Sequence, residues 1–402
     1  MKVLIADKFE KVGVDGLKEL GCAVVSKPEV TAEQLPEVIR ENDPHILLVR
    51  SKKVNAAALE AGTILELVIR AGAGVDTIDV PSASRLGIFV ANCPGKNSIA
   101  VAELVMGLLL SCDRRIPDQV AELRQGKWNK AEYSKARGVY GRTLGIVGLG
   151  QIGREIATRA QAFGMKVVAW SRHLTVEDAT QMGVEYAQTP IDVAHVSDAV
   201  SINVAGTPET KHLVDAKFLA AMKPGAYLIN TSRGSVVDED ALCEAIKVKG
   251  IRCGLDVFQN EPAGGTGQFD NPIVQEPGVY GTHHVGASTD QAQVAIAHEV
   301  IRIVQAFKET DQVPNCVNRL AKSSATHVLS VRHRNRPGVL AHVFRVLANG
   351  SINVEEVENI IYHGAQATCA RIHLDGRPDE DALARIKAGN EDVISVALSE
   401  IP

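Results

Sequence analysis

Residues 143–163 have the sequence TLGIVGLGQIGREIATRAQAF, and this stretch decides how the fold is interpreted. Its first half predicts a buried strand, and its second half predicts a helix. Between them, Gly148, Gly150 and Gly153 form a G-x-G-x-x-G pattern. In that context the first glycine permits the turn, the second lets the backbone approach a pyrophosphate and the third lets helix and strand pack. The helix N-terminus adds free N–H groups. We therefore expect a dinucleotide-binding loop, rather than only a tight turn, formed by Gly148, Gly150, Gln151, Ile152 and Gly153.

The next predicted strand ends at Ser171 and Arg172. An NAD site usually places Asp or Glu at this point to accept hydrogen bonds from the ribose 2′-hydroxyl. A hydroxyl and a guanidinium would suit a 2′-phosphate instead, so this pair favours NADP. Alternatively, Arg172 is a solvated surface residue and the site accepts NAD. The expected cofactor is therefore NAD or NADP.

The alternation of strand and helix extends over most of the chain. Short runs that are apolar on both faces, separated by helix-length segments, are typical of buried parallel sheets. A first series of runs begins at Lys2, Cys22, His45, Leu65 and Ile88, and a second at Thr143, Lys166, Ala199, Ala226 and Ile251. We expect an α/β fold with two doubly wound Rossmann-like domains in tandem.

Two further segments lie outside these series. Residues 97–112 predict a long apolar helix, which is either an element between domains or subunits or a buried core helix. Residues 326–402, after a polar break at 318–324, have the β-α-β-β-α-β order of a ferredoxin-like sandwich. The chain therefore ends in a distinct small domain.

The composition excludes some classes of protein. Of 402 residues, 45% are hydrophobic and 23% charged, and a formal net charge of −5 gives no basic field for nucleic acid. The seven cysteines show no CxxC spacing, which favours reduced thiols and no metal site. The longest apolar stretch, 99–110, is too short to span a bilayer, and the N-terminus lacks a signal-peptide pattern. We expect a cytoplasmic protein that binds neither nucleic acid nor membrane.

Three polar segments follow later strands of the second series: 229–234, 254–262 and 282–288. Ligands of open α/β sheets bind outside the carboxyl ends of the strands, so these segments should converge on one crevice. There Arg233 can bind a carboxylate with two hydrogen bonds, and His284 can exchange a hydroxyl proton. Glu261 can orient the imidazole and stabilise its protonated form. Such a set suits hydride transfer at a carbon that bears a hydroxyl group.

The glycine loop and these segments resemble the D-2-hydroxyacid dehydrogenase family over nearly all of residues 1–315. The resemblance implies that Arg233, Glu261 and His284 are the catalytic residues. His283 stands where the family has proline, which leaves two adjacent histidines, and the HVGAST sequence that starts at His284 favours His284 as the proton carrier.

The same resemblance implies further cofactor contacts and a domain division. Asp256 matches the family's residue near the nicotinamide amide, and Thr231 lies beside the expected ring position. The full set of cofactor residues then also includes Asn203, His284 and Gly286. The family's substrate-binding domain, here 1–96 and 283–316, is split around a nucleotide-binding Rossmann domain, here 97–282.

Basic residues near the N-terminus indicate an anionic substrate. One strand ends in Arg50, Ser51, Lys52 and Lys53, and the glycine-rich turn 71–76 follows the next strand. Backbone N–H groups at Ala73 and Gly74 can hold a carboxylate. The cations can hold a phosphate, unless they form only a solvated basic turn. This arrangement resembles the phosphoglycerate dehydrogenases within the family, whose lysine at the position of Lys130 reaches the phosphate from the partner subunit.

The last domain, 325–402, resembles an ACT domain. Asn and His offer directional donors and acceptors for the charged groups of an amino acid, and Gly338 lets the backbone approach closely. His333, Asn335 and Asn353 match the serine-binding positions of feedback-inhibited bacterial phosphoglycerate dehydrogenases. L-serine is therefore the expected effector, and a capped turn without a ligand is the alternative.

Together, these resemblances imply an NAD(P)-dependent dehydrogenase that converts 3-phosphoglycerate to 3-phosphohydroxypyruvate, the first step towards serine. One alternative is an NADP-dependent glyoxylate or hydroxypyruvate reductase of the same family. The other is a non-catalytic nucleotide-sensing protein, such as the corepressors that share this fold. If Lys130 acts across an interface, a homodimer or homotetramer is expected.

Overall fold

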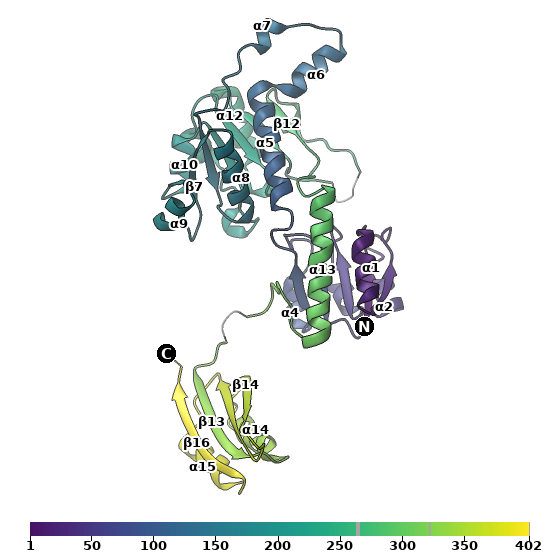
Figure 1. The fold of residues 1–402 in the computed structure, drawn as a ribbon, viewed down its shortest axis with the longest axis vertical. Coiled ribbons are helices and arrows are strands. Elements are labelled where there is room, and N and C mark those ends of the chain that lie inside the picture. Colours follow the sequence, from purple (N-terminus) through teal and green to yellow (C-terminus); the bar gives the residue numbers. More distant parts are fainter. Residues whose placement is uncertain (263–265, 321–322, 402) are drawn as a thin grey trace. The chain divides into compact units, whose positions relative to one another are not determined.

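The computed structural model describes residues 1–262, 266–320 and 323–401. It divides into two units, Met1–Asn318 and Arg319–Pro402 (Figure 1). The first unit contains two parallel sheets, and the second contains one antiparallel sheet. Among the described residues, no helix combines the length and apolar character needed to cross a membrane.

The first sheet comes from the N-terminal residues. Its five parallel strands have the order β2-β1-β3-β4-β5. Their bounds are β1 Lys2–Ile5, β2 Ala23–Ser26, β3 Ile46–Val49, β4 Leu67–Arg70 and β5 Phe89–Asn92, and the helices between them are α1 Lys11–Glu19, α2 Leu35–Asn42, α3 Ala56–Glu60 and α4 Val80–Arg85. Apolar clusters cover both faces of the sheet, which explains why β3 is buried along its whole length. The carboxyl ends of all five strands lie along one edge.

The second sheet has seven parallel strands in the order β12-β11-β10-β9-β6-β7-β8. The strands are β6 Thr143–Val147, β7 Lys166–Trp170, β8 Glu185–Tyr186, β9 Ala199–Ile202, β10 Tyr227–Asn230, β11 Arg252–Leu255 and β12 Val279–Gly281. The helices are α8 Gln151–Ala162, α9 Val176–Gln181, α10 Pro190–Val196, α11 Ala216–Ala221 and α12 Glu239–Lys249. The chain order reverses between β6 and β9, which is where doubly wound sheets bind their ligands.

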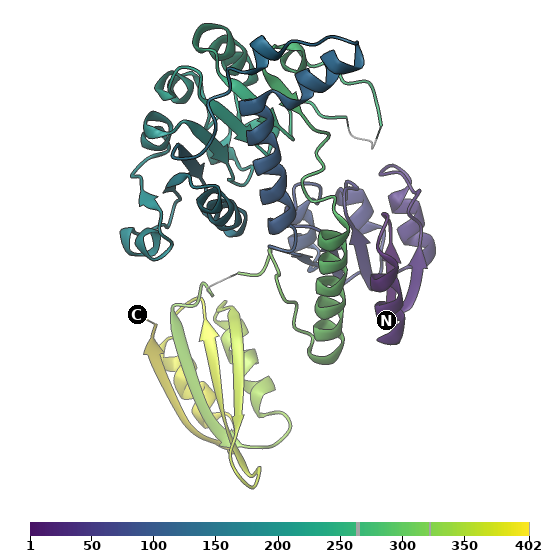
Figure 2. The same cartoon turned by 45° about the horizontal axis from the view of Figure 1, so that its top comes forward.

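Two long helices connect the two sheets. Helix α5 Ser98–Arg114 follows β5 and lies in the hydrophobic core of the second sheet, with α8. Helix α13 Asp290–Thr310 follows β12 and packs in the core of the first sheet, beside α1 (Figure 2). The predicted helix at 97–112 therefore connects the two sheets and is also buried in the core of the second one, so the structure combines both alternatives. Two short helices after it, α6 Ile116–Arg124 and α7 Lys130–Tyr133, have no buried residues.

The end of the first unit is tied to the edge of its first sheet. Cys316 forms an antiparallel bridge with Ala91 of β5. The Asn318 side chain accepts the Val90 N–H at 2.8 Å and donates to the Ile88 carbonyl oxygen at 2.8 Å. Asn318 was predicted to begin the polar break, but it completes the sheet edge instead. Residues 321 and 322 of that break lie outside the described residues.

The second unit has the predicted β-α-β-β-α-β order. Its elements are β13 His327–Arg334, α14 Val339–Asn349, β14 Val354–Ile361, β15 Ala367–Leu374, α15 Glu380–Ala388 and β16 Val393–Glu400, with the sheet order β14-β15-β13-β16. Side chains of β13 alternate between buried and exposed. Leu329, Val331 and His333 share its buried face, which packs in the single core of this unit. Pro402, the predicted end of the domain, lies outside the described residues.

A buried carboxylate ties α13 to the connection between the two sheets. Glu299 lies 3.2 Å from the ammonium of Lys96 and 2.6 Å from Arg302, and it accepts a 2.7 Å hydrogen bond from Asn315. The hydrogen bond from Arg302 is the main cause that lowers the pKa of Glu299 to about 2, against the opposing effect of burial. This residue therefore stabilises the folded first unit as a carboxylate.

We expect Glu299→Gln to lower the free energy of unfolding by about 2 kcal/mol at pH 7, because it removes a buried ionic partner of three side chains. The folded-state pKa is depressed, so the contribution is present above pH 4.5 and is lost as the pH falls towards 2. Urea denaturation of both proteins at pH 7 and at lower pH measures this difference. The matched control is Glu309→Gln on the same helix, an exposed residue that contacts Gln305. A stability difference that does not shrink in acid would contradict the assignment.

Candidate active site

The glycine loop lies between β6 and α8, and its geometry agrees with the three expected roles. Gly148 has a φ of +100°, and a Cβ there would lie 2.5 Å from the Asn203 carbonyl oxygen. At Gly153 a Cβ would lie 2.3 Å from the Gly148 carbonyl oxygen. At Gly150 it would meet no atom within 4 Å, so the backbone is open to a ligand. Because α8 begins at this point without a side-chain cap, its N–H groups can bind a pyrophosphate.

Other predicted cofactor residues lie around the same edge of the second sheet. The Gln151 amide would overlap a Cβ at Gly95, so it lies against the connection from β5 to α5. Asn203 follows β9, and its amide donates to the Ser201 hydroxyl at 3.1 Å. Ser171 is partly exposed and Arg172 is exposed after β7, where both can reach a ribose. Two more members of the set are partly buried, Ile152 at the start of α8 and Thr231 after β10.

Glu261 and His284 form a close pair. Nδ1 of His284 lies 2.7 Å from Oε2 of Glu261, and Oε1 of Glu261 accepts the Phe258 N–H at 2.8 Å. Burial raises the pKa of Glu261, but the hydrogen bonds from His284 and Phe258 outweigh it, so the pKa lies below its ordinary value. An ionised Glu261 holds Nδ1 and leaves Nε2 of His284 to exchange a proton. The neighbouring His283 is exposed.

Asp256 anchors the loop that carries His284. Its carboxylate is 1% exposed and accepts the N–H groups of Val285 and Gly286, both at 2.9 Å, and the hydroxyl of Thr282 at 2.6 Å. His284 adopts a left-handed backbone with a φ of +54°, which a residue with a Cβ rarely adopts. The hydrogen bonds from the next two residues, Val285 and Gly286, to Asp256 hold His284 in this conformation. Asp256 thus anchors the histidine loop, and its place near a nicotinamide amide stays a prediction.

Arg233 is positioned by the turn that follows β10. Asn230 is buried, and its amide donates to the Arg233 carbonyl oxygen at 3.0 Å while its oxygen accepts the Ser232 N–H at 3.0 Å. A Cβ at Gly234 would lie 2.0 Å from the Phe258 backbone, so the Arg233 turn touches the segment that leads to Glu261. Consistently, the charge of Arg233 contributes to the lowered pKa of Glu261, after burial and the hydrogen bonds described above.

The basic segment after β3 is organised by Asp7, which follows β1. The Asp7 carboxylate accepts the backbone N–H groups of Arg50, Ser51 and Lys52 at 2.7, 3.0 and 3.0 Å. The guanidinium of Arg50 reaches Ser288, just beyond the histidine loop, at 3.3 Å. Lys52 was predicted to face the substrate, but its ammonium is bound to the carbonyl oxygens of Pro28 and Val30. Arg50 is therefore better placed than Lys52 to meet a ligand.

The glycine-rich turn after β4 completes this edge. Arg70, the last residue of β4, donates through Nε to the Arg50 carbonyl oxygen at 2.8 Å. Its guanidinium fills the space in which a Cβ at Gly72 would lie. Burial, then the charge of Arg233, lowers the pKa of Arg70. Ala73 is held by Asn92, which donates to its carbonyl oxygen, and Gly74 lies against Arg233.

The structure thus brings the predicted catalytic residues close to the predicted substrate-binding residues of the first sheet. Contacts link Arg50 to Ser288, and Glu261 to His284, while Arg233 is near Glu261. These residues come from the carboxyl edges of both sheets. The arrangement can bind an anionic carboxylate beside a proton-exchanging imidazole and a dinucleotide loop.

Four other predicted residues are Lys130 in the first unit and three residues in the second. Lys130 is exposed at the start of α7. In the second unit, His333 is buried, with Nδ1 bonded to the Arg334 carbonyl oxygen and Nε2 without a partner. Asn335 and Asn353 donate to the Ala365 carbonyl oxygen and to Glu355, respectively. No contact among these three side chains is present in the described part of the second unit.

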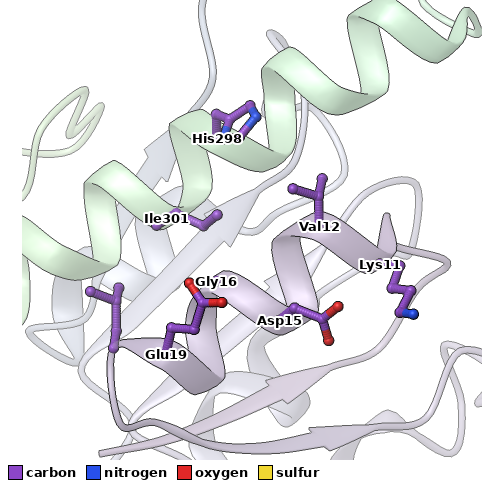
Figure 3. Close-up of a pocket in the computed structure, with 8 residues that line it drawn as sticks. Lys11, Val12, Asp15, Gly16, Glu19, His298 and Ile301 are labelled. Atoms are coloured by element: carbon purple, nitrogen blue, oxygen red, sulfur yellow. The ribbon is translucent and has the colours of Figure 1, made fainter.

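A groove of about 710 Å³ also lies on the first unit, between α1 and α13 (Figure 3). Figure 3 shows Val12 of α1 pointing towards α13, which carries His298 and Ile301, and the charged Lys11, Asp15 and Glu19 of α1 also line the groove. The groove is open, with mixed charges, and contains none of the predicted site residues. We assign it no role in the candidate site.

Sequence reasoning missed Asp7, Arg70, Asp76 and Asn230. Each of them holds a predicted site residue through a hydrogen bond or an ion pair. Their positions in the sequence could have indicated a role at the site, because all four lie at or just after the carboxyl end of a strand or in the turn that follows it.

Comparison with known proteins identifies the family. Residues 106–286 match the model described as D-isomer specific 2-hydroxyacid dehydrogenase, NAD binding domain. The chain is 36% identical to D-3-phosphoglycerate dehydrogenase of Methanocaldococcus jannaschii over 409 aligned positions, which cover 98% of this chain and 74% of that protein. It is 38% identical to D-3-phosphoglycerate dehydrogenase of Synechocystis, covering 74% of this chain but 52% of that protein, so it spans about half the length of that relative.

Shorter relatives match about four fifths of this chain. Hydroxypyruvate reductase of Thermotoga maritima is 37% identical over 310 residues, which cover 77% of this chain and 98% of that protein. The solved structure of the TT0316 protein from Thermus thermophilus has a TM-score of 0.70 and 30% identity, covering 79% of this chain and all of that one. The chain therefore belongs to the family of D-isomer-specific 2-hydroxyacid dehydrogenases.

Proposed function

We propose that this chain is an NAD(P)-dependent dehydrogenase that oxidises 3-phosphoglycerate at C2 to 3-phosphohydroxypyruvate, the first step towards L-serine. The observation that carries the proposal is the 2.7 Å contact between His284 and Glu261, close to Arg233. Relatives named D-3-phosphoglycerate dehydrogenase, at 36% and 38% identity, support the choice of substrate.

Each candidate catalytic residue has a role that follows from its contacts. Arg233 binds the substrate carboxylate and polarises the C2 oxygen. Nε2 of His284 accepts the C2 hydroxyl proton, and Glu261 stabilises the resulting imidazolium through Nδ1. Asp256 keeps His284 in its left-handed backbone conformation.

The dinucleotide fits the loop between β6 and α8. A bound nicotinamide supplies the hydride acceptor for C2. The pyrophosphate is held by the Gly150 backbone and the N-terminus of α8, and the ribose by Ser171 and Arg172. The hydroxyl of Ser171 and the cation of Arg172 support binding of NADP as well as NAD.

The phosphate of the substrate is proposed to meet Arg50 and the neighbouring Ser51. Lys52 adds positive charge there while its ammonium supports the loop through Pro28 and Val30. The N–H groups of Ala73 and Gly74 lie on the same edge and suit the carboxylate. In this assignment residues 1–96 and 283–316 form the substrate-binding domain, and 97–282 form the nucleotide-binding domain.

Lys130 is proposed to reach the phosphate of a partner subunit in a homodimer or homotetramer. It lies on the segment of α6 and α7, which has no buried residues. Exposed apolar side chains on this segment include Ile116, Leu123 and Trp128, of which Trp128 is 81% exposed. A second copy of the chain would bury them.

The second unit is proposed to be an ACT domain, residues 325–402, that binds L-serine. The β-α-β-β-α-β order and the unpartnered, buried Nε2 of His333 support this role. Asn335 and Asn353 would contribute amide groups for the carboxylate and ammonium of serine.

A hydroxypyruvate reductase is the second candidate, because the Thermotoga maritima relative with that name matches over almost its whole length. That protein aligns with 77% of this chain, and the basic residues at Arg50 and Lys52 favour the phosphorylated substrate. A non-catalytic nucleotide-sensing protein would show no turnover.

We expect the chain to reduce 3-phosphohydroxypyruvate with a kcat/KM at least ~10-fold above that for hydroxypyruvate or glyoxylate, because Arg50 can bind the phosphate. NADH or NADPH oxidation at 340 nm, with each keto acid and each cofactor, measures the preference. Higher kcat/KM for hydroxypyruvate would support the reductase instead, and no turnover with any substrate would support the sensing protein.

We expect Glu261→Gln to lower kcat for keto acid reduction by roughly 100-fold. Reduction needs a protonated imidazole, and glutamine removes the charge that stabilises it. The pH above which reduction declines should therefore move to a lower value. Full pH–rate profiles of both proteins measure the shift, with Glu276→Gln, which removes the ionic partner of Lys247, as the control. An unchanged profile would exclude the assigned role of Glu261.

We expect L-serine to inhibit the wild-type protein, and Asn335→Ala to raise the half-inhibitory serine concentration by at least ~10-fold, because a directional amide contact is lost. Activity at increasing serine concentration, relative to each protein without serine, measures this. Asn349→Ala, an exposed residue at the end of α14, is the control. No response to millimolar serine in the wild type would remove the regulatory role and leave the catalytic one intact.

A further inference from the structure

One side chain at the candidate site has no role in the proposed function. Asp76, in the glycine-rich turn after β4, pairs with Arg233 from the turn after β10, 157 residues away. Its Oδ2 accepts from Nε of Arg233 at 2.7 Å and lies 2.6 Å from a terminal nitrogen of the same guanidinium. We propose that Asp76 is a positioning residue that fixes the orientation of Arg233 towards the substrate, an inference that rests on the proposed function.

A count of the N–H donors of Arg233 shows which of them remain available for the substrate. A guanidinium has five N–H donors in one plane. Asp76 takes the one on Nε, and its Oδ2 also lies 2.6 Å from one terminal nitrogen, while the Ser232 carbonyl oxygen takes one on the other terminal nitrogen, at 2.7 Å. At least one N–H therefore remains on each terminal nitrogen. These two donors can bind the substrate carboxylate and the C2 oxygen.

Two glycines show that the Arg233 side chain lies in a narrow slot. A Cβ at Gly74 would lie 2.2 Å from a terminal nitrogen of Arg233, and a Cβ at Gly206 would lie 2.9 Å from its Cγ. Neither glycine has a φ in the left-handed region, so neither is needed for its backbone freedom. Both provide space. The slot limits where the guanidinium can move, and Asp76 fixes it within the slot.

The charges around Arg233 explain why a carboxylate is needed in a site for anions. Arg70 lies close to both Arg233 and Arg50, and burial, followed by the charge of Arg233, lowers the pKa of Arg70, while Asp76 opposes that effect. Without ligand, the guanidinium groups repel one another. Asp76 offsets this repulsion and keeps Arg233 in the binding position.

The solvent exposure of the Asp76–Arg233 ion pair argues against a role that is limited to folding stability. The side chains of Arg233 and Asp76 are 32% and 51% exposed. Ion pairs this exposed contribute little to folding stability. Their effect is instead on orientation, since a small displacement of a substrate-binding group can cost a large factor in rate.

The test compares Asp76→Ala, Asp76→Glu and wild type in the reduction of 3-phosphohydroxypyruvate. We expect Asp76→Ala to lower kcat by at least ~10-fold, because Arg233 loses its orientation, and Asp76→Glu to retain more of the rate, because the charge is kept. The melting temperature, and the dissociation constant for NADH measured by fluorescence, should stay close to the wild-type values in both variants.

The matched control is Asp79→Ala, three residues further along the chain. Asp79 caps α4 through the N–H and hydroxyl of Ser82, so its loss should lower the melting temperature while kcat is kept. The two variants thus separate positioning from stability.

A double variant tests whether Asp76 acts through Arg233. In an Arg233→Ala background, Asp76→Ala should cause no further loss of the residual rate, because the group it orients is absent. Additive losses, a kcat for Asp76→Ala within twofold of wild type, or a lower KM with unchanged kcat would each overturn the inference. The last result would mean that Asp76 competes with the substrate. A wild-type protein without turnover on any 2-keto acid would instead refute the proposed function itself.

Discussion

The candidate active site depends on one buried carboxylate, that of Asp256. It lies just after β11, and both its oxygens accept hydrogen bonds from residues 282–286. These bonds hold His284 at a φ of +54°, a conformation that costs about 1–2 kcal/mol for a residue with a Cβ. Because the carboxylate is buried, its bonds are strong enough to offset that strain. The direction of the imidazole, and hence its contact with Glu261, follows from this anchor.

A second constraint is the close approach of backbone to backbone in the same region. Gly234 touches the Phe258 backbone, and Phe258 donates to Glu261. The turn that carries Arg233 and the turn that carries Glu261 are therefore fixed relative to each other by van der Waals contact. In this way residues from two successive strands, β10 and β11, act as one rigid support for the chemistry.

The sequence predicts those parts of the fold and the site that are encoded by a few neighbouring residues. The glycine loop is recognisable because all of its requirements fall within six residues, and the structure shows the expected open space at Gly150. Strands β8 and β12, with two and three residues, are too short to give a periodic signal. The ends of α12 also carry local signals, since Asp238 caps its first turn and Gly250 follows its last residue.

The residues that the sequence did not predict act over long distances along the chain. Asp7 binds a loop 43 residues away, and Asp76 binds a residue 157 positions away. Neither carboxylate belongs to a pattern with its partner, so only the folded chain shows the contact. The same reason explains Lys52, whose carbonyl partners, Pro28 and Val30, have no side-chain signal in the sequence.

The bonds of Asn318 to β5 have an evolutionary consequence. They satisfy the Val90 N–H and the Ile88 carbonyl oxygen, at the edge of the first sheet, with a residue from the same unit. A gene could gain or lose a C-terminal module after this point without exposing a new sheet edge. The relative from Thermotoga maritima, almost all of which aligns with 77% of this chain, is consistent with such modular exchange.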